Sequence, residues 1–168
     1  MEKVRFGIIG IGNMGTGHVE SIAGGHIENA VLAAVCDLKE DRLAYVTEKY
    51  GTDIATYTDY KEMLASGKID AVLIATPHYL HPVIAIEAFE AGLHVLSEKP
   101  IGVYTKKVEE FIQVARESGK VFGLMFNQRT NPAYQKIREI VQSGELGELK
   151  RCVWIITDWY RTQAYYNS

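Results

Sequence analysis

Cysteine is scarce in this sequence, and its placement argues against cysteine metal ligands. The 168 residues include two cysteines, Cys36 and Cys152, in separate apolar runs and without a metal-type spacing such as C-x-x-C. We therefore expect buried thiols, no metal ion and a reducing, cytoplasmic location.

Basic clusters and long hydrophobic runs are missing as well. The net charge is −3 with no basic block or stripe, which argues against nucleic acid as a partner. The longest apolar runs have the length of strands, so we expect no membrane span. Residues 1–3 lead directly into an apolar segment, so we expect no signal peptide. The length suits one well-cored domain, or one domain with part of another.

The most informative feature that is present lies at the start, where the apolar run 4–9 ends in a G-x-G-x-x-G pattern. The first glycine permits a tight turn, the second lets a pyrophosphate approach the backbone, and the third lets the next helix pack closely. The N-terminus of that helix would then face the phosphates. The pattern predicts a dinucleotide site, with NAD as the cofactor, at Gly10, Ile11, Gly12, Asn13, Met14 and Gly15.

Asp37 ends a second apolar run, 30–36, and lies 22 residues after Gly15. This is close to the ~20 residues expected for the acid that binds the adenosine ribose. Its carboxylate would accept hydrogen bonds from the ribose hydroxyls and repel a 2′-phosphate, which favours NAD over NADP. Lys39 and Arg42 lie nearby and partly offset that charge, so NADP stays open. The alternative is that Asp37 caps the next helix.

Apolar runs alternate with helical patterns along most of the chain. This alternation predicts an α/β fold, a Rossmann doubly wound parallel sheet built through right-handed crossovers. Runs such as 71–75 are apolar throughout, as expected for strands covered on both faces. The predicted strands are 4–9, 30–36, 54–57, 71–75, 93–97 and 121–125, and the predicted helices are 14–24, 40–50, 60–66, 81–91, 105–118 and 132–143.

The pattern changes after Gly144. Residues 149–159 are rich in aromatic and β-branched side chains and predict a strand, but no helix follows. A single strand cannot bury itself. We therefore interpret residues 1–126 as a nucleotide-binding domain. Residues 127–168 are interpreted as a linker helix and the first strand of a second, truncated α/β domain.

Two further segments, together with the glycine-rich start, resemble one protein family. They are Ala75-Thr76-Pro77-His78-Tyr79-Leu80-His81-Pro82 and Gly92-Leu93-His94-Val95-Leu96-Ser97-Glu98-Lys99-Pro100. The chain resembles the Gfo/Idh/MocA family, named after glucose-fructose oxidoreductase, inositol dehydrogenase and rhizopine catabolism, from residue 1 to about 160. The resemblance implies an NAD(P)-dependent oxidoreductase that acts on sugars, cyclitols or related polyols. It also implies a second domain with an open sheet, and a homo-oligomer.

Residues that follow the fourth and fifth predicted strands would meet at the edge of the sheet where ligands bind in such folds. The resemblance assigns cofactor contacts there to Thr76, Pro77, His78, His81, Glu98, Lys99 and Pro100. His78 departs from the family, which usually has Asn at this position. For His81 the alternative is a helix cap. Asn127, after the sixth strand, faces either the nicotinamide end or linker backbone.

Lys99 is the one catalytic residue that the resemblance assigns within this chain. Its cation would polarise the developing carbonyl during hydride transfer, and the alternative is only a surface ion pair between the neighbouring Glu98 and a basic group. In the family a downstream histidine commonly supplies the acid/base function, so we expect the 168-residue chain to bind NAD but to turn over poorly. A different class of function remains open: a non-catalytic NAD-binding sensor or scaffold.

Overall fold

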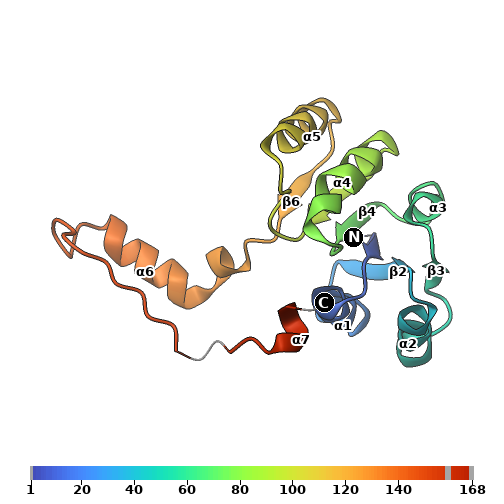
Figure 1. The fold of residues 1–168 in the computed structure, drawn as a ribbon, viewed down its shortest axis with the longest axis horizontal. Helices are drawn as coiled ribbons and strands as arrows, with labels where there is room; N and C mark the ends of the chain where they lie inside the picture. The colour runs from blue at the N-terminus through green and yellow to red at the C-terminus, as the bar shows by residue number, and fades with distance from the viewer. Residues whose placement is uncertain (1, 158–159, 167–168) are drawn as a thin grey trace. The chain divides into compact units, whose positions relative to one another are not determined.

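Six parallel strands form one sheet in the computed structural model, which describes residues 2–157 and 160–166. The strand order is β3-β2-β1-β4-β5-β6, so the chain starts in the middle, moves to one edge, then crosses back to build the other half (Figure 1). This is the order of a doubly wound Rossmann sheet. The strands are β1 Val4–Ile9, β2 Ala30–Cys36, β3 Ala55–Tyr57, β4 Ala71–Ile74, β5 His94–Ser97 and β6 Phe122–Leu124.

Helices connect the strands and cover both faces of the sheet. The α-helices are α1 Asn13–Ala23, α2 Glu40–Tyr50, α3 Tyr60–Leu64, α4 His81–Glu90, α5 Thr105–Glu117, α6 Pro132–Gln142 and α7 Gln163–Tyr166, with 3₁₀ turns η1 His78–Leu80 and η2 Asn127–Thr130. The predicted Rossmann fold is confirmed. The six predicted strands above, and α1 to α6, match their predicted bounds to within two residues at each end. The two 3₁₀ turns and α7 were not predicted.

Two separate core clusters explain why β4 is apolar at every position. In β4, Leu73 packs into the cluster that includes residues of α1 and α2, whereas Val72 and Ile74 pack into the cluster that includes residues of α3, α4 and α5. Successive side chains of a strand point to opposite faces. With helices on both sides, neither face of this strand reaches water, and polar side chains would be costly at either one.

The chain divides into two compact units, Met1–Phe126 and Asn127–Ser168. The first contains the whole sheet and α1 to α5. In the second, α6 begins after Asn131, whose side chain accepts a hydrogen bond from the N–H of Ala133, with Pro132 at the first helical position. This is the capping pattern that the sequence favours at a helix start.

The strand predicted for residues 149–159 does not form over residues 149–157, and Asp158 and Trp159 lie outside the described residues. The prediction was wrong here for a physical reason. A strand is stabilised by hydrogen bonds to a neighbouring strand. The described part of the second unit contains no strand that could supply them. Trp154 instead contacts Tyr134 of α6, with ring centroids 5.3 Å apart.

Candidate functional site

The turn between β1 and α1 has the glycine geometry of a phosphate-binding turn. Gly10 has a φ of +88°, and a Cβ there would lie 2.8 Å from the carbonyl oxygen of Ala75. A Cβ on Gly15 would collide with the carbonyl oxygen of Gly10, whereas one on Gly12 would meet no described atom within 4 Å. The first and third glycines therefore close the turn, and the second leaves its outer face open.

The N-terminus of α1 follows this turn directly. The helix begins at Asn13 after Gly12, and no side chain among the described residues caps it. The first N–H groups of a helix have no partner within the helix, and together with the helix dipole they favour an anion. Ile11 is buried beneath the turn, while Asn13 and Met14 are exposed. This placement matches a site for a pyrophosphate.

Asp37 is buried directly after β2, and its carboxylate is hydrogen-bonded to the backbone of the glycine turn. Its Oδ2 accepts a hydrogen bond of 2.7 Å from the N–H of Ile11, and Oδ1 accepts one of 3.0 Å from the N–H of Lys39. The guanidinium of Arg42 lies 3.1 Å from Oδ2. Burial alone would raise the pKa of Asp37, but these donors outweigh it and hold the pKa below its ordinary value. The carboxylate is therefore ionised at neutral pH, and this negative charge would repel the 2′-phosphate of NADP.

Backbone hydrogen bonds continue past the strand ends and join the four segments of the site. The N–H of Gly10 donates a hydrogen bond of 2.8 Å to the carbonyl oxygen of Cys36. In the same way, and at the same distance, the N–H of Ala75 donates to the carbonyl oxygen of Ile9, and the N–H of Glu98 donates to the carbonyl oxygen of Ile74. The segments after β1, β2, β4 and β5 thus lie side by side at one edge. This edge brings together the predicted residues from Gly10 to Gly15, Asp37, Thr76 to His81, and Glu98 to Pro100.

The segment after β4 contains an unpaired polar atom and a buried ring. The Oγ1 of Thr76 is buried and has no hydrogen-bond partner among the described residues. His81 has no exposed surface. Its Nδ1 lies 2.7 Å from the carbonyl oxygen of Pro100, and its Nε2 lies 2.7 Å from that of Thr76.

These contacts give His81 a bridging role between the segments after β4 and β5. With both ring nitrogens occupied and the ring buried, no ring atom is left for direct contact with a cofactor. The ring is not a helix cap either, since α4 has no side-chain cap. Pro77 and His78 are exposed at the same edge, and the His78 ring meets His81 edge-on with centroids 5.7 Å apart.

The segment after β5 separates a buried carboxylate from an exposed lysine. Glu98 is buried, and its Oε1 lies 2.8 Å from Nε2 of His18 in α1. Lys99 is exposed, and no ion pair involves its ammonium among the described residues. Glu98 thus pairs with a basic side chain, that of His18, but the two side chains are only 14% and 8% exposed, so this is not a surface pair. Pro100 is exposed, and the Lys99–Pro100 peptide bond is cis.

Asn127 belongs to the second unit, where it begins η2. Its carbonyl oxygen accepts a hydrogen bond of 2.8 Å from the hydroxyl of Thr130. This contact involves the backbone of Asn127 alone, so both alternatives for its side chain stay predictions.

Sequence reasoning missed two residues at this edge. His18 lies three positions after Gly15, and residues three apart share one face of a helix, so the signal was available in the helical spacing. Leu38, directly after Asp37, is 89% exposed. A large apolar side chain this exposed beside a ligand edge is a candidate surface for a flat ring.

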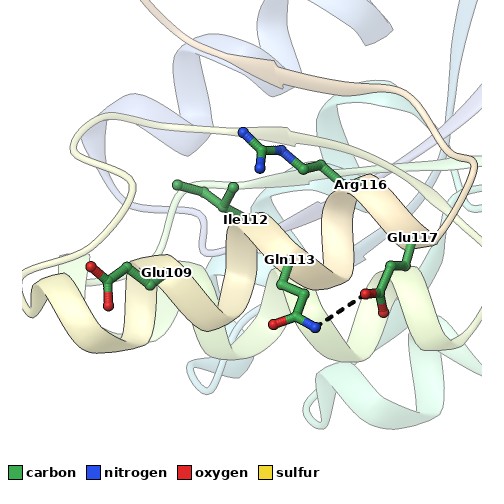
Figure 2. Close-up of a pocket in the computed structure, with 5 residues that line it drawn as sticks. All are labelled: Glu109, Ile112, Gln113, Arg116 and Glu117. Atoms are coloured by element: carbon green, nitrogen blue, oxygen red, sulfur yellow. Dashed lines mark hydrogen bonds between the residues drawn. The ribbon is translucent and has the colours of Figure 1, made fainter.

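A shallow hollow elsewhere in the first unit lies along one face of α5. It is lined by Glu109, Ile112, Gln113, Arg116 and Glu117, and Gln113 donates a hydrogen bond of 3.1 Å to Glu117 (Figure 2). All five side chains come from one helix and none follows a strand end. The hollow therefore adds nothing to the edge described above.

The part of the chain that the structure describes holds no cluster of metal ligands, since no three His, Cys, Asp or Glu side chains gather there as such ligands would. Cys36 is buried and Cys152 is exposed, against the expectation that both are buried. Burial raises the pKa of the Cys36 thiol to about 12, so it is a poor nucleophile. None of the described helices is long and apolar enough to cross a membrane.

Comparison with known proteins gives a family match over the first unit. Residues 4–126 match the family model described as "Oxidoreductase family, NAD-binding Rossmann fold". A myo-inositol 2-dehydrogenase of Thermotoga maritima is 32% identical over 145 residues, which are 86% of this chain and 42% of that protein. The chain thus spans less than half the length of this relative.

Solved structures show the same arrangement. A scyllo-inositol dehydrogenase from Lactobacillus casei with bound NAD(H) and scyllo-inositol matches with a TM-score of 0.82 and 30% identity, over 88% of this chain and 43% of that one. The WlbA dehydrogenase from Bordetella pertussis, in complex with NADH and UDP-GlcNAcA, matches with a TM-score of 0.84 and 29% identity. The match covers 99% of this chain and 50% of that one.

Proposed function

The chain belongs to the Gfo/Idh/MocA oxidoreductase family, and we propose that it is the cofactor-binding part of an NAD-dependent dehydrogenase that oxidises an alcohol group of a cyclitol, sugar or related polyol. The observation that carries this proposal is the sheet edge itself. There an uncapped helix N-terminus, an ionised carboxylate and an exposed lysine follow parallel strands of one sheet, β1, β2 and β5. This is the edge at which such sheets bind their ligands.

The residues present fit NAD. The open face of Gly12 and the first N–H groups of α1 would hold the pyrophosphate, and Asp37 would accept the ribose hydroxyls on the β2 side. Leu38 offers an exposed apolar surface for adenine next to that carboxylate. On the other side of β1, the unpaired hydroxyl of Thr76 is a free hydrogen-bonding group for the nicotinamide half.

The proposed chemistry depends on Lys99. When bound, NAD supplies the hydride acceptor. An ammonium beside the reacting alcohol donates a hydrogen bond to its oxygen and stabilises the negative charge that grows there as the proton leaves. Lys99 is exposed and without an ion-pair partner among the described residues, so it is available for this contact.

The second unit supports a further part of the proposal. We assign residues 127–168 to a linker helix and the start of a substrate and oligomerisation domain, since the chain spans 42% of its Thermotoga relative. The proton acceptor and most substrate contacts would then belong to a part of the natural protein that follows Ser168. The 168-residue chain should bind NAD with little turnover, and the natural protein that carries it should be a homo-oligomer. Robust polyol oxidation by the 168-residue chain would contradict this division.

The inositol dehydrogenases among the relatives favour a cyclitol as the substrate. Titration calorimetry on the 168-residue chain tests the cofactor proposal. We expect NAD⁺ and NADH to bind at least about tenfold more tightly than NADP⁺, a difference of ~1.4 kcal/mol. No heat with either NAD form at millimolar concentration would overturn the proposal.

One substitution distinguishes an enzyme from a sensor or scaffold. In the natural protein, Lys99→Ala should reduce kcat for polyol oxidation by about a hundredfold or more while NAD binding changes little. The matched control is Lys106→Ala, which removes an exposed lysine of α5. If the two variants show the same turnover, Lys99 has no catalytic role.

A further inference from the structure

His18 and Glu98 form a buried pair that the proposed chemistry does not use. The Nε2 of His18 and the Oε1 of Glu98 lie 2.8 Å apart, and the two side chains are 14% and 8% exposed. A carboxylate this poorly solvated needs hydrogen-bond donors, because an unpaired charge in the interior is costly. A carboxylate oxygen can only accept a hydrogen bond, so an Nε2–H on His18 is the donor that this pair offers to Oε1.

The pair joins two segments with different tasks. His18 lies in α1, one turn after Gly15, on the helix whose N-terminus would hold the pyrophosphate. Glu98 directly precedes Lys99, and its second oxygen, Oε2, accepts a hydrogen bond of 3.3 Å from the N–H of Lys99. One carboxylate therefore connects the phosphate-binding helix with the backbone of the lysine.

The strand order divides a bound dinucleotide between these segments. Asp37 follows β2, on one side of β1, whereas Lys99 follows β5, beyond β4 on the other side. With the pyrophosphate at the turn after β1, the adenosine half lies toward β2 and the nicotinamide half toward β4 and β5. The His18–Glu98 pair belongs to the nicotinamide side alone.

We propose that His18 is a positioning residue, which holds Glu98 so that the segment with Lys99 is placed against the nicotinamide half of NAD. This inference rests on the proposed function and adds a residue to it. His18 itself touches neither the cofactor nor the substrate. Its effect passes through Glu98 and the backbone N–H of Lys99, so losing it should weaken contacts to nicotinamide and spare contacts to adenosine and pyrophosphate.

The test compares two ligands on the 168-residue chain. NADH contains the nicotinamide half, whereas ADP-ribose keeps adenosine and pyrophosphate but lacks nicotinamide. In His18→Leu the donor to Glu98 is lost, and we expect the Kd for NADH to rise about tenfold while the Kd for ADP-ribose rises less than about threefold. The fluorescence enhancement of bound NADH should fall in parallel, because its nicotinamide ring is less well held.

Two variants serve as controls. In His18→Gln the amide nitrogen lies the same number of bonds from Cα as Nε2, so it should restore NADH binding to within about threefold of the unmodified chain. His26→Gln changes an exposed histidine beyond the other end of α1 and should leave both ligands unaffected. If His18→Leu does not fold, Glu98→Gln replaces it, with the same selective loss of NADH binding expected.

The outcomes distinguish failure of the positioning role from failure of the proposed function. Equal weakening of NADH and ADP-ribose in His18→Leu, or no weakening of either, overturns the positioning role and leaves the proposed function intact. An unmodified chain that binds neither ligand overturns the proposed function and the positioning role with it. A selective loss of NADH binding that His18→Gln restores supports both.

Discussion

The two units of this chain differ in what their apolar side chains contact. In the first unit, the strands and helices bury apolar residues in two clusters on opposite faces of a sheet. In the second, none of the described residues is buried, and large side chains such as Ile137, Trp154 and Ile155 are exposed. The periodicity of α6 is as helical as that of the buried helices. The comparison teaches that an amphipathic pattern specifies where a helix forms but supplies no partner to cover its apolar face.

The largest expected difference between the units concerns the core. Ile8 is completely buried in β1, so Ile8→Ala should lower the free energy of unfolding by about 3 kcal/mol, through lost burial and the cavity left behind. The matched control Ile137→Ala, at a residue of α6 that is 49% exposed, should change it by less than about 0.5 kcal/mol. Urea denaturation followed by circular dichroism measures both. Similar losses would mean that α6 is covered in solution.

A second expected effect separates two positions within α1. Gly15→Ala places a methyl group against the carbonyl oxygen of Gly10 and should destabilise the first unit by about 1–3 kcal/mol and abolish NADH binding. Gly17→Ala meets no described atom within 4 Å and should stabilise the helix by up to ~1 kcal/mol. Thermal melts and NADH titrations of both variants check this. Retained binding in Gly15→Ala would contradict the tight turn.

A third, smaller effect compares a buried carboxylate with an exposed one. The pKa of Asp37 lies below its ordinary value. Its contribution to stability is therefore present above the unfolded pKa of about 3.9 and is lost as the pH falls through the lower folded value. Asp37→Asn should cost about 1 kcal/mol at pH 7 and remove part of the acid-induced loss of stability below about pH 4.

The control for Asp37 is Glu139→Gln, which breaks the exposed Lys136–Glu139 pair of α6. Such surface pairs contribute about 0–1 kcal/mol, so this variant should follow the stability of the unmodified chain at each pH. Denaturation midpoints from pH 3 to pH 7 are the measurement. Parallel curves for Asp37→Asn and the unmodified chain would show that the buried hydrogen bonds do not shift its titration.

The smallest expected effect is that of removing the second unit. A chain that ends at Phe126 keeps the whole sheet and both core clusters. It should unfold with a free energy within about 1 kcal/mol of the longer chain, a shift of less than about 8 °C in Tm, and it should still bind NADH. A much lower Tm would mean that residues after 126 stabilise the sheet.

Much of the site was predictable, because its residues sit where local patterns are strong. The glycine turn and Asp37 follow apolar strands at a recognisable spacing, and the strand order brings them together. The helical spacing after Gly15 places His18 near the site, but its pairing was not predictable, because its partner, Glu98, is 80 residues away in sequence. The contacts of His81 were not predictable, because its partners, the carbonyl oxygens of Thr76 and Pro100, come from two segments that meet only in the folded chain.

The sequence by itself determined the order of strands and helices in the first unit and the positions of its turns, because these depend on periodicity, glycine and capping within short segments. Only the tertiary structure decided which side chains pair at the sheet edge, namely Glu98 with His18 rather than Lys99. It also decided that residues 149–157 form no strand. Both outcomes depend on partners distant in sequence, since hydrogen bonds and burial are properties of what lies nearby in space.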